Sequence, residues 1–231
     1  MIFNKPGYKN TLDVFKIVDE AAEKQNIDTV IIASSSGETG LAALEFFGFQ
    51  NDEECSGEKR GGQTSNNSQE DSWGRTRKII KNIIIVSHVA GFEGPDVLDM
   101  EPGVKKQLET AGAVVITAAH SLGGIGRAAR IKFGTYGTDE LMANALRLFG
   151  EGTKVAIEIS MMAVDAGAVS TMERVIAIGG TSSGADTALI LQPANTHRFF
   201  DIRVDEILCK PAVSKAWFKE QKASAEGEAG Q

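Results

Sequence analysis

The sequence has few of the residues that would point to a disulfide-rich, membrane or nucleic-acid-binding protein. Its 231 residues include only two cysteines, Cys55 and Cys209, which suits a reducing cytoplasm and gives neither a disulfide framework nor a metal-ligand spacing. No stretch of the sequence resembles a signal peptide, and we expect no membrane helix, because every apolar run is far shorter than the roughly 18 residues that one needs. The 31 acidic and 24 basic residues give a net charge of -7. We therefore expect a soluble cytoplasmic protein without a nucleic-acid or membrane partner.

The residues that are present indicate an α/β protein. A helical pattern over residues 10–26 leads to an apolar strand at 29–33, which a polar loop joins to a helix at 38–47. Further helices are predicted at 102–111, 125–133 and 138–149. Further strands are predicted at 78–87, 113–117, 155–159, 175–178, 187–191 and 202–209.

Two segments differ from the rest in composition. Residues 50–77 are dominated by Gly, Ser, Asn, Gln, Glu and Lys, and only Cys55 and Trp73 could be buried there. Such a segment buries too little apolar surface to offset its ordering entropy. We therefore predict one domain over residues 1–212, interrupted by a flexible insertion at 50–77. Residues 213–231 are predicted to be a flexible tail.

Residues 34–39, the serine loop, form the most informative stretch. They separate a predicted buried strand from a predicted helix, so backbone N–H groups at a helix N-terminus lie beside several hydroxyls. These are the donors that a phosphate needs, and glycine lets the backbone approach an anion closely. The alternative is a serine-capped helix without a ligand. The candidate binding residues of this loop are Ser34, Ser35, Ser36, Gly37, Glu38 and Thr39.

A second polar loop and several single residues follow other predicted strands. Because ligands of open α/β sheets bind at the carboxyl ends of strands, we expect His88, His120 and Ser160 to lie near the serine loop. Residues 179–187, the glycine-rich loop, are expected there as well. Both loops offer N–H and hydroxyl donors without an evident acid–base pair, which favours binding over bond cleavage. The candidates in the second loop are Gly179, Gly180, Thr181, Ser182, Gly184, Ala185, Asp186 and Thr187.

Several candidates have a structural alternative. His88 and His120 could be hydrogen-bonded residues at strand ends rather than ligand contacts. Glu158, within the predicted strand 155–159, needs a partner, which could be backbone amides of a neighbouring loop or a ligand hydroxyl or ring N–H. Asp186 could contact a ligand, but capping its own loop is the preferred interpretation.

Residues 119–124, AHSLGG, resemble the nucleophile elbow of α/β-hydrolases because they follow a predicted strand and precede a predicted helix. Ser121 would be the nucleophile, with Asp165 or Asp186 and then His197 completing a triad. The elbow normally has glycine where Ala119 stands. A serine hydrolase is therefore a minor alternative.

Taken together, several segments resemble the archaeal and bacterial proteins related to the C-terminal α/β domain of pyruvate kinase, which occur without its catalytic barrel. The similarity covers about residues 3–47 and 79–211. It is carried by KPG at 5–7, ASSSGETGLAALE at 33–45, TAAHSLGGIGRA at 117–128, EISMMAVDAGAV at 158–169 and GGTSSGADTALILQPA at 179–194.

This resemblance implies a mixed, mostly parallel sheet with helices on both faces. In pyruvate kinase the domain holds an allosteric sugar-phosphate site, and the serine loop corresponds in position to its phosphate-binding loop. The glycine-rich loop resembles the later loop beside that site, and flavin mononucleotide (FMN) has been associated with the equivalent cleft of the stand-alone family. Pyruvate kinase activity is not implied, because the domains that bind phosphoenolpyruvate, metal and ADP are missing from this sequence.

The leading expectation is therefore an FMN-binding protein, with the phosphate on the serine loop and the rest of the ligand against the glycine-rich loop. Two other functions stay open at this point. One is a sugar-phosphate or nucleotide sensor that uses the same cleft, and the other is a flavin-dependent oxidoreductase with His88, His120 or Glu158 near the ring. Homo-oligomers are common among such domains, but the sequence does not give the oligomeric state.

Overall fold

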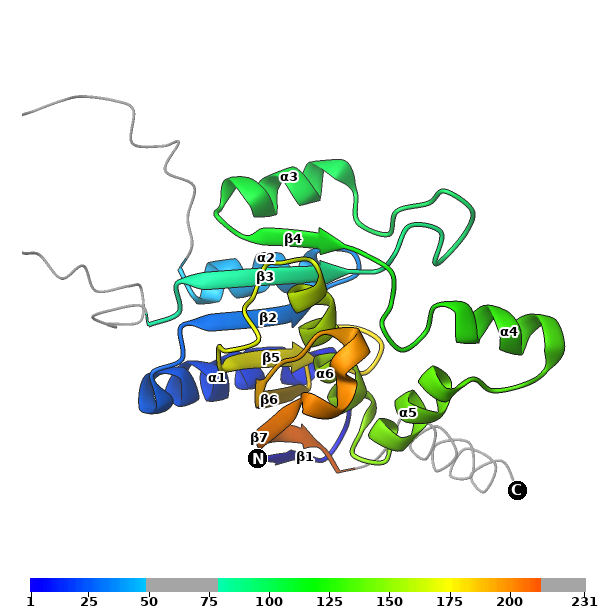
Figure 1. Ribbon diagram of the computed structural model, residues 1–231. Coiled ribbons are helices and arrows are strands. Elements are labelled where there is room, and N and C mark those ends of the chain that lie inside the picture. Colours follow the sequence, from blue (N-terminus) through cyan, green and yellow to red (C-terminus); the bar gives the residue numbers. More distant parts are fainter. Residues whose placement is uncertain (49–78, 213–231) are drawn as a thin grey trace, which may run out of the picture.

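The computed structural model describes residues 1–48 and 79–212 (Figure 1). The predicted insertion at 50–77 and the predicted tail at 213–231 lie outside the described residues. The strands are β1 (Ile2–Phe3), β2 (Thr29–Ala33), β3 (Asn82–Ser87), β4 (Val114–Thr117), β5 (Val175–Gly179), β6 (Thr187–Gln192) and β7 (Arg203–Pro211). The α-helices are α1 (Thr11–Gln25), α2 (Glu38–Phe46), α3 (Pro102–Thr110), α4 (Ile125–Phe133), α5 (Thr138–Arg147) and α6 (Glu151–Asp165), and short 3-10 helices cover Tyr8–Asn10 and Thr196–Asp201.

The strands form a seven-stranded sheet in the order β1-β7-β6-β5-β2-β3-β4. β6 runs antiparallel to both of its neighbours, and every other pair is parallel, so the expected mixed, mostly parallel sheet is confirmed. The register pairs Ala33 with Val86 and Ser87 with Thr117. The chain therefore leaves β2, β3 and β4 along one edge, which brings the segments that follow these strands together.

Helices cover both faces of the sheet, as expected (Figure 1). Alternate residues of β2 point to opposite faces because strand side chains have a period of two. Val30 and Ile32 join a core cluster with α1, α2 and α3, whereas Ile31 joins a second cluster with α6. α5 packs on α6, and α4 contacts α5 and buries none of its own residues. α4 and α5 therefore extend beyond the carboxyl edge of the sheet.

The predicted strand at 155–159 is wrong, because these residues belong to α6. In this segment apolar residues alternate with others, which is typical of a strand. The helix is instead buried nearly all round, since only Glu151, Val155 and Asp165 are not fully buried. A helix without a solvent face loses the period that distinguishes it from a strand. Ser160 consequently lies inside this helix, where its hydroxyl donates to the carbonyl of Ile157 at 2.7 Å.

Candidate functional site

A cleft of about 750 Å³ lies at the carboxyl ends of β2, β3 and β4. Its volume falls within the roughly 300–1,000 Å³ typical of small-molecule sites. The sheet edge forms one wall, and residues from α4, α5 and α6 form the other. Five of the sequence-predicted site residues line this cleft, namely Ser34, Ser35, His88, His120 and Glu158.

The serine loop makes the turn from β2 into α2. Ser34 is buried, and its hydroxyl accepts a hydrogen bond from the N–H of Gly40 at 3.1 Å, so it secures the turn. Gly37 has φ +94° and is packed against the side chain of Val104. No described residue accepts a hydrogen bond from the backbone N–H of Ser35, Ser36 or Gly37. The loop therefore presents open donors in the turn that leads into α2, whereas the N–H groups of Glu38 and Gly40 at the start of the helix donate to the hydroxyls of Ser36 and Ser34. Its other predicted members, Ser36, Gly37, Glu38 and Thr39, lie beside the cleft wall and not in it.

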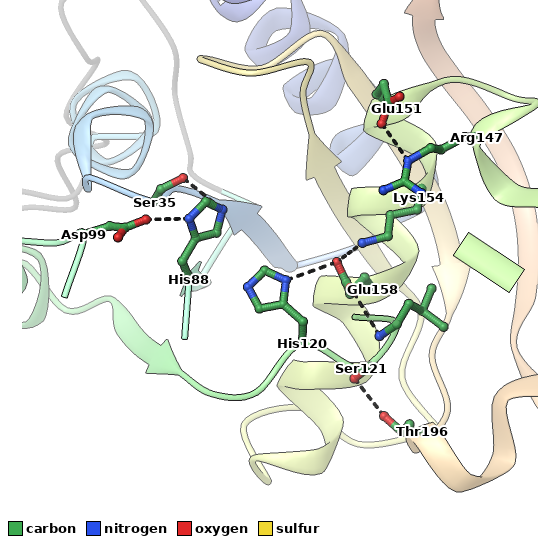
Figure 2. Close-up of polar contacts among 11 residues, drawn as sticks. Ser35, His88, Asp99, His120, Ser121, Arg147, Glu151, Lys154, Glu158 and Thr196 are labelled. Carbon is green, nitrogen blue, oxygen red and sulfur yellow. Dashed lines mark hydrogen bonds and ion pairs between the residues drawn. The ribbon is translucent and has the colours of Figure 1, made fainter. Parts of the chain in front are cut away.

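His88 follows β3 and lies between two partners (Figure 2). Its Nδ1 is 2.5 Å from Oδ2 of Asp99, and its Nε2 is 3.4 Å from Oγ of Ser35. The carboxylate of Asp99 is acceptor-only, so Nδ1 carries a proton in this contact. Nε2 of the neutral ring is then free to accept a proton, and this nitrogen faces the serine hydroxyl.

Glu158 lies on α6 beneath the cleft and gathers three partners (Figure 2). It accepts a hydrogen bond from the N–H of Leu122 at 2.9 Å, it pairs with the ammonium of Lys154, and Nδ1 of His120 is 3.7 Å away. Burial raises the pKa of Glu158, but the neighbouring His120 ring and the charge of Lys154 outweigh it and lower the pKa to about 2. Of the two kinds of partner considered for Glu158, a backbone amide of a neighbouring loop is present in the structure.

The other ring nitrogen of His120 is a buried polar atom of the cleft wall. Nε2 of His120 has no hydrogen-bond partner among the described residues. A buried polar group without a partner is costly, and most such groups in proteins are satisfied. This nitrogen is therefore positioned to bond a polar atom of a ligand in the cleft.

Aromatic rings and a cation complete the wall. The ring of Phe92 is stacked on that of His120, with centroids 5.3 Å apart and an interplanar angle of 7°, and it lies 4.1 Å from the ring of His88. The guanidinium of Arg127 on α4 lies 4.9 Å from the centre of the Phe92 ring. Arg130 and Arg147 also line the cleft but pair with glutamates, whereas Arg127 has no ion pair among the described residues. The cleft thus joins an apolar, aromatic surface to a cation that is available for an anion.

The glycine-rich loop does not offer the expected open donors, because other groups of the chain already accept their hydrogen bonds. Oδ2 of the fully buried Asp186 accepts hydrogen bonds from the N–H groups of Gly7 and Thr181 at 2.8 and 3.1 Å, and Oδ1 accepts from the hydroxyl of Thr187. The preferred capping role of Asp186 is confirmed. The N–H of Ala185 donates to the hydroxyl of Thr11.

The prediction of free donors in this loop is therefore wrong for the N–H groups of Thr181, Ser183, Ala185 and Asp186, which all have partners within the chain. The loop packs against the segment that precedes α1 and against the start of α6. None of the binding residues predicted in this loop lines the cleft. The predicted residues were Gly179, Gly180, Thr181, Ser182, Gly184, Ala185, Asp186 and Thr187.

Ser121 is not paired with a histidine in the structure (Figure 2). Its hydroxyl lies 2.8 Å from that of Thr196, which in turn contacts Asp165. Hydrogen bonds from Thr196 and Asn195 lower the pKa of Asp165 against the opposing effect of burial. No hydrogen bond between Ser121 and His197 occurs in the described part of the chain, so the triad considered for Ser121 is not assembled.

Sequence reasoning missed four residues of this site: Phe92, Asp99, Arg127 and Lys154. Phe92 and Asp99 lie in the irregular segment between β3 and α3, which carries no periodic signal. The spacing of Lys154 and Glu158 was a usable signal, because oppositely charged residues four apart pair on one face of a helix. That spacing favours a helix over the strand predicted there.

Within residues 1–48 and 79–212, no group of three or more potential metal-ligating side chains is gathered in one place, and no helix has the length and apolar character needed to cross a membrane. No model of a known protein family matches the chain.

Proposed function

We propose that this chain binds a phosphate-bearing ligand with a planar ring, FMN by preference, in the cleft at the carboxyl ends of β2, β3 and β4. The observation that carries the proposal is the combination of open N–H donors on the serine loop with the aromatic wall of Phe92 and His120. A phosphate suits the first feature because N–H groups at a helix N-terminus attract anions. A planar ring suits the second because aromatic faces pack on aromatic rings.

The residues of the cleft fit a flavin in two further respects. The cleft volume of about 750 Å³ is sufficient for a ligand of drug size. The unpartnered Nε2 of His120 offers a hydrogen bond to a polar ring atom. The resemblance to the stand-alone relatives of the pyruvate kinase C-terminal domain favours the same ligand. The glycine-rich loop has no part in this arrangement, since the chain itself occupies most of its donors.

The first test is the absorption spectrum of the purified protein, followed by titration of flavin-free protein with FMN. We expect Phe92→Ala to weaken FMN binding at least about tenfold, which corresponds to 1.4 kcal/mol. Phe200→Ala is the matched control, because Phe200 is 86% exposed and does not line the cleft. Failure of the wild-type protein to bind FMN, or equal affinity in wild type and Phe92→Ala, would refute the proposal.

A sugar phosphate could use the same donors without the aromatic wall. Competition with fructose bisphosphate separates the two ligands. If FMN is the ligand, the sugar phosphate does not displace it at comparable concentration. If the sugar phosphate binds tightly, and with the same affinity in wild type and Phe92→Ala, the protein is instead a sensor of phosphorylated metabolites.

A further inference from the structure

We propose that Ser35, His88 and Asp99 form a catalytic triad, and that the chain cleaves carboxylic esters by transferring the acyl group to Ser35. The two contacts of His88 have the order that this chemistry requires: Asp99 bonds Nδ1, and Ser35 faces Nε2 at 3.4 Å. This activity goes beyond ligand binding and does not depend on FMN.

The acid and the base of this group are held in place. The side chain of Asp99 is only 10% exposed and that of His88 31% exposed, so their contact is largely shielded from water. The carboxylate fixes the ring in the tautomer whose Nε2 can accept a proton, which is the role of aspartate in Ser-His-Asp triads. The separation of 3.4 Å between Nε2 and Oγ is long, but catalytic hydrogen bonds often shorten only when substrate binds.

Ser35 also occupies the position that a nucleophile needs. It follows β2 and precedes α2, in the sequence Ala33-Ser34-Ser35-Ser36-Gly37. This differs from the G-x-S-x-G pattern of the nucleophile elbow in its first residue, as the segment around Ser121 does, so the triad rests on the contacts of His88 and not on this motif. The chain order of Ser35, His88 and Asp99 differs from that of α/β-hydrolases, but triads are defined by geometry and not by order.

A developing oxyanion would find donors at the same turn. In the nucleophile elbow, the N–H of the residue after the serine stabilises the tetrahedral intermediate. Here that residue is Ser36, whose N–H has no acceptor among the described residues and which lies in the turn just before the nine-residue helix α2. The helix dipole favours negative charge at this end.

The reaction proceeds in two balanced steps. In the first, Oγ of Ser35 forms a bond to the ester carbonyl carbon, and its proton passes to Nε2 of His88. The bond between carbonyl carbon and alkoxy oxygen then breaks, and His88 returns the proton to the leaving alcohol. In the second step, water attacks the acyl-enzyme while His88 accepts a water proton. The Ser35 oxygen leaves with that proton, so the products are one alcohol and one carboxylic acid.

The neighbours of the triad indicate the class of ester. Phe92 contacts His88, and Arg127 lies over Phe92 without an ion pair among the described residues. A substrate at Ser35 would therefore place an apolar part against Phe92 and an anionic group near Arg127. We infer that the preferred substrate is an ester that carries a carboxylate or a phosphate.

Labelling with a fluorophosphonate tests the triad directly. We expect the probe to modify Ser35 of the full-length wild-type protein, as identified by peptide mass spectrometry. Labelling should disappear in Ser35→Ala and persist in Ser121→Ala. The decisive measurement is the labelling of Ser35 in the wild-type protein, so a variant that fails to fold does not affect the result. Because FMN would occupy the same cleft, the label is applied to folded, flavin-free wild-type protein, and absence of label on Ser35 there would overturn the proposal.

Hydrolysis of p-nitrophenyl esters gives the second reading. We expect Ser35→Ala and Asp99→Asn each to lower turnover of p-nitrophenyl acetate at least about 100-fold. Equal turnover by wild type and Ser35→Ala would overturn the triad. Arg127→Ala should raise KM for p-nitrophenyl hemisuccinate about tenfold and leave KM for the acetate unchanged. Equal effects on both esters would overturn the assignment of an anionic substrate.

Discussion

Two loops of this protein have similar compositions but differ in whether their backbone N–H groups have hydrogen-bond acceptors within the chain. The serine loop and the glycine-rich loop both follow parallel strands and are both rich in Gly, Ser and Thr. In the first, the N–H groups of Ser35 and Ser36 have no described acceptor, whereas in the second the buried carboxylate of Asp186 and the hydroxyl of Thr11 accept from the N–H groups of Thr181 and Ala185. The composition of a Gly/Ser/Thr loop therefore does not determine whether its backbone donors stay open.

The largest effect is expected from removing the acid that closes the glycine-rich loop. Asp186→Ala leaves the N–H groups of Gly7 and Thr181 and the hydroxyl of Thr187 without their acceptor. Buried donors without partners are costly, so we expect a loss of about 3 to 4 kcal/mol in the free energy of unfolding. Urea denaturation measures this loss. If the variant were as stable as the wild type, the difference between the two loops would not be maintained by Asp186.

Replacing Glu158, which lines the cleft, should lower the free energy of unfolding by a comparable amount, and this loss should depend on pH. Its pKa of about 2, against an ordinary 4.5, corresponds to about 3 kcal/mol of stability. Because the folded pKa is the lower one, this stability is fully present above about pH 4.5 and is lost as the pH falls toward 2. We expect Glu158→Gln to be destabilised at pH 7 and to approach wild-type stability at low pH.

Denaturation of both proteins between pH 7 and 2.5 checks this expectation. Glu151→Gln is a suitable control, because the Glu151–Arg147 pair is 38% exposed on both sides and an exposed pair contributes little. A stability difference between Glu158→Gln and wild type that did not change with pH would contradict the assigned ionisation.

Two glycine substitutions compare how tightly the loops are packed, and their expected effects on the free energy of unfolding are smaller. Gly184 has φ +68°, and a methyl group there would lie 2.4 Å from the backbone Cα of Tyr8. Gly37 has φ +94°, but its methyl group would meet the side chain of Val104, which can move. We expect Gly184→Ala to cost about 2 kcal/mol and Gly37→Ala about 1 kcal/mol. Thermal denaturation should rank them in this order, and the reverse ranking would show that the serine loop is the more tightly packed.

Much of the fold could be predicted from the sequence, because most elements have a clear period. The helix at residues 125–133 and the strand at 29–33 have the predicted bounds. The error at 155–159 has a physical cause: α6 is buried on nearly every side, so its apolar residues show no helical stripe.

The candidate site was less accessible to sequence reasoning. His88, His120 and Glu158 stood out as polar residues near strand ends or within an apolar run, and the structure brings them to one cleft. Asp99 and Phe92 did not stand out, because they belong to an irregular segment and reach His88 only through the fold. The difference between the two loops was hidden as well, because the groups that fill the second loop come from the other end of the chain.

The most direct test of the account is to place the same negative charge in each loop and measure FMN affinity. Ser36 and Ser183 are both exposed serines, one in each loop. Repulsion between an aspartate and the phosphate should weaken FMN binding by Ser36→Asp at least about tenfold, or 1.4 kcal/mol, while Ser183→Asp binds like the wild type. Equal affinities in the two variants, or weaker binding only in Ser183→Asp, would contradict the claim that the serine loop holds the phosphate.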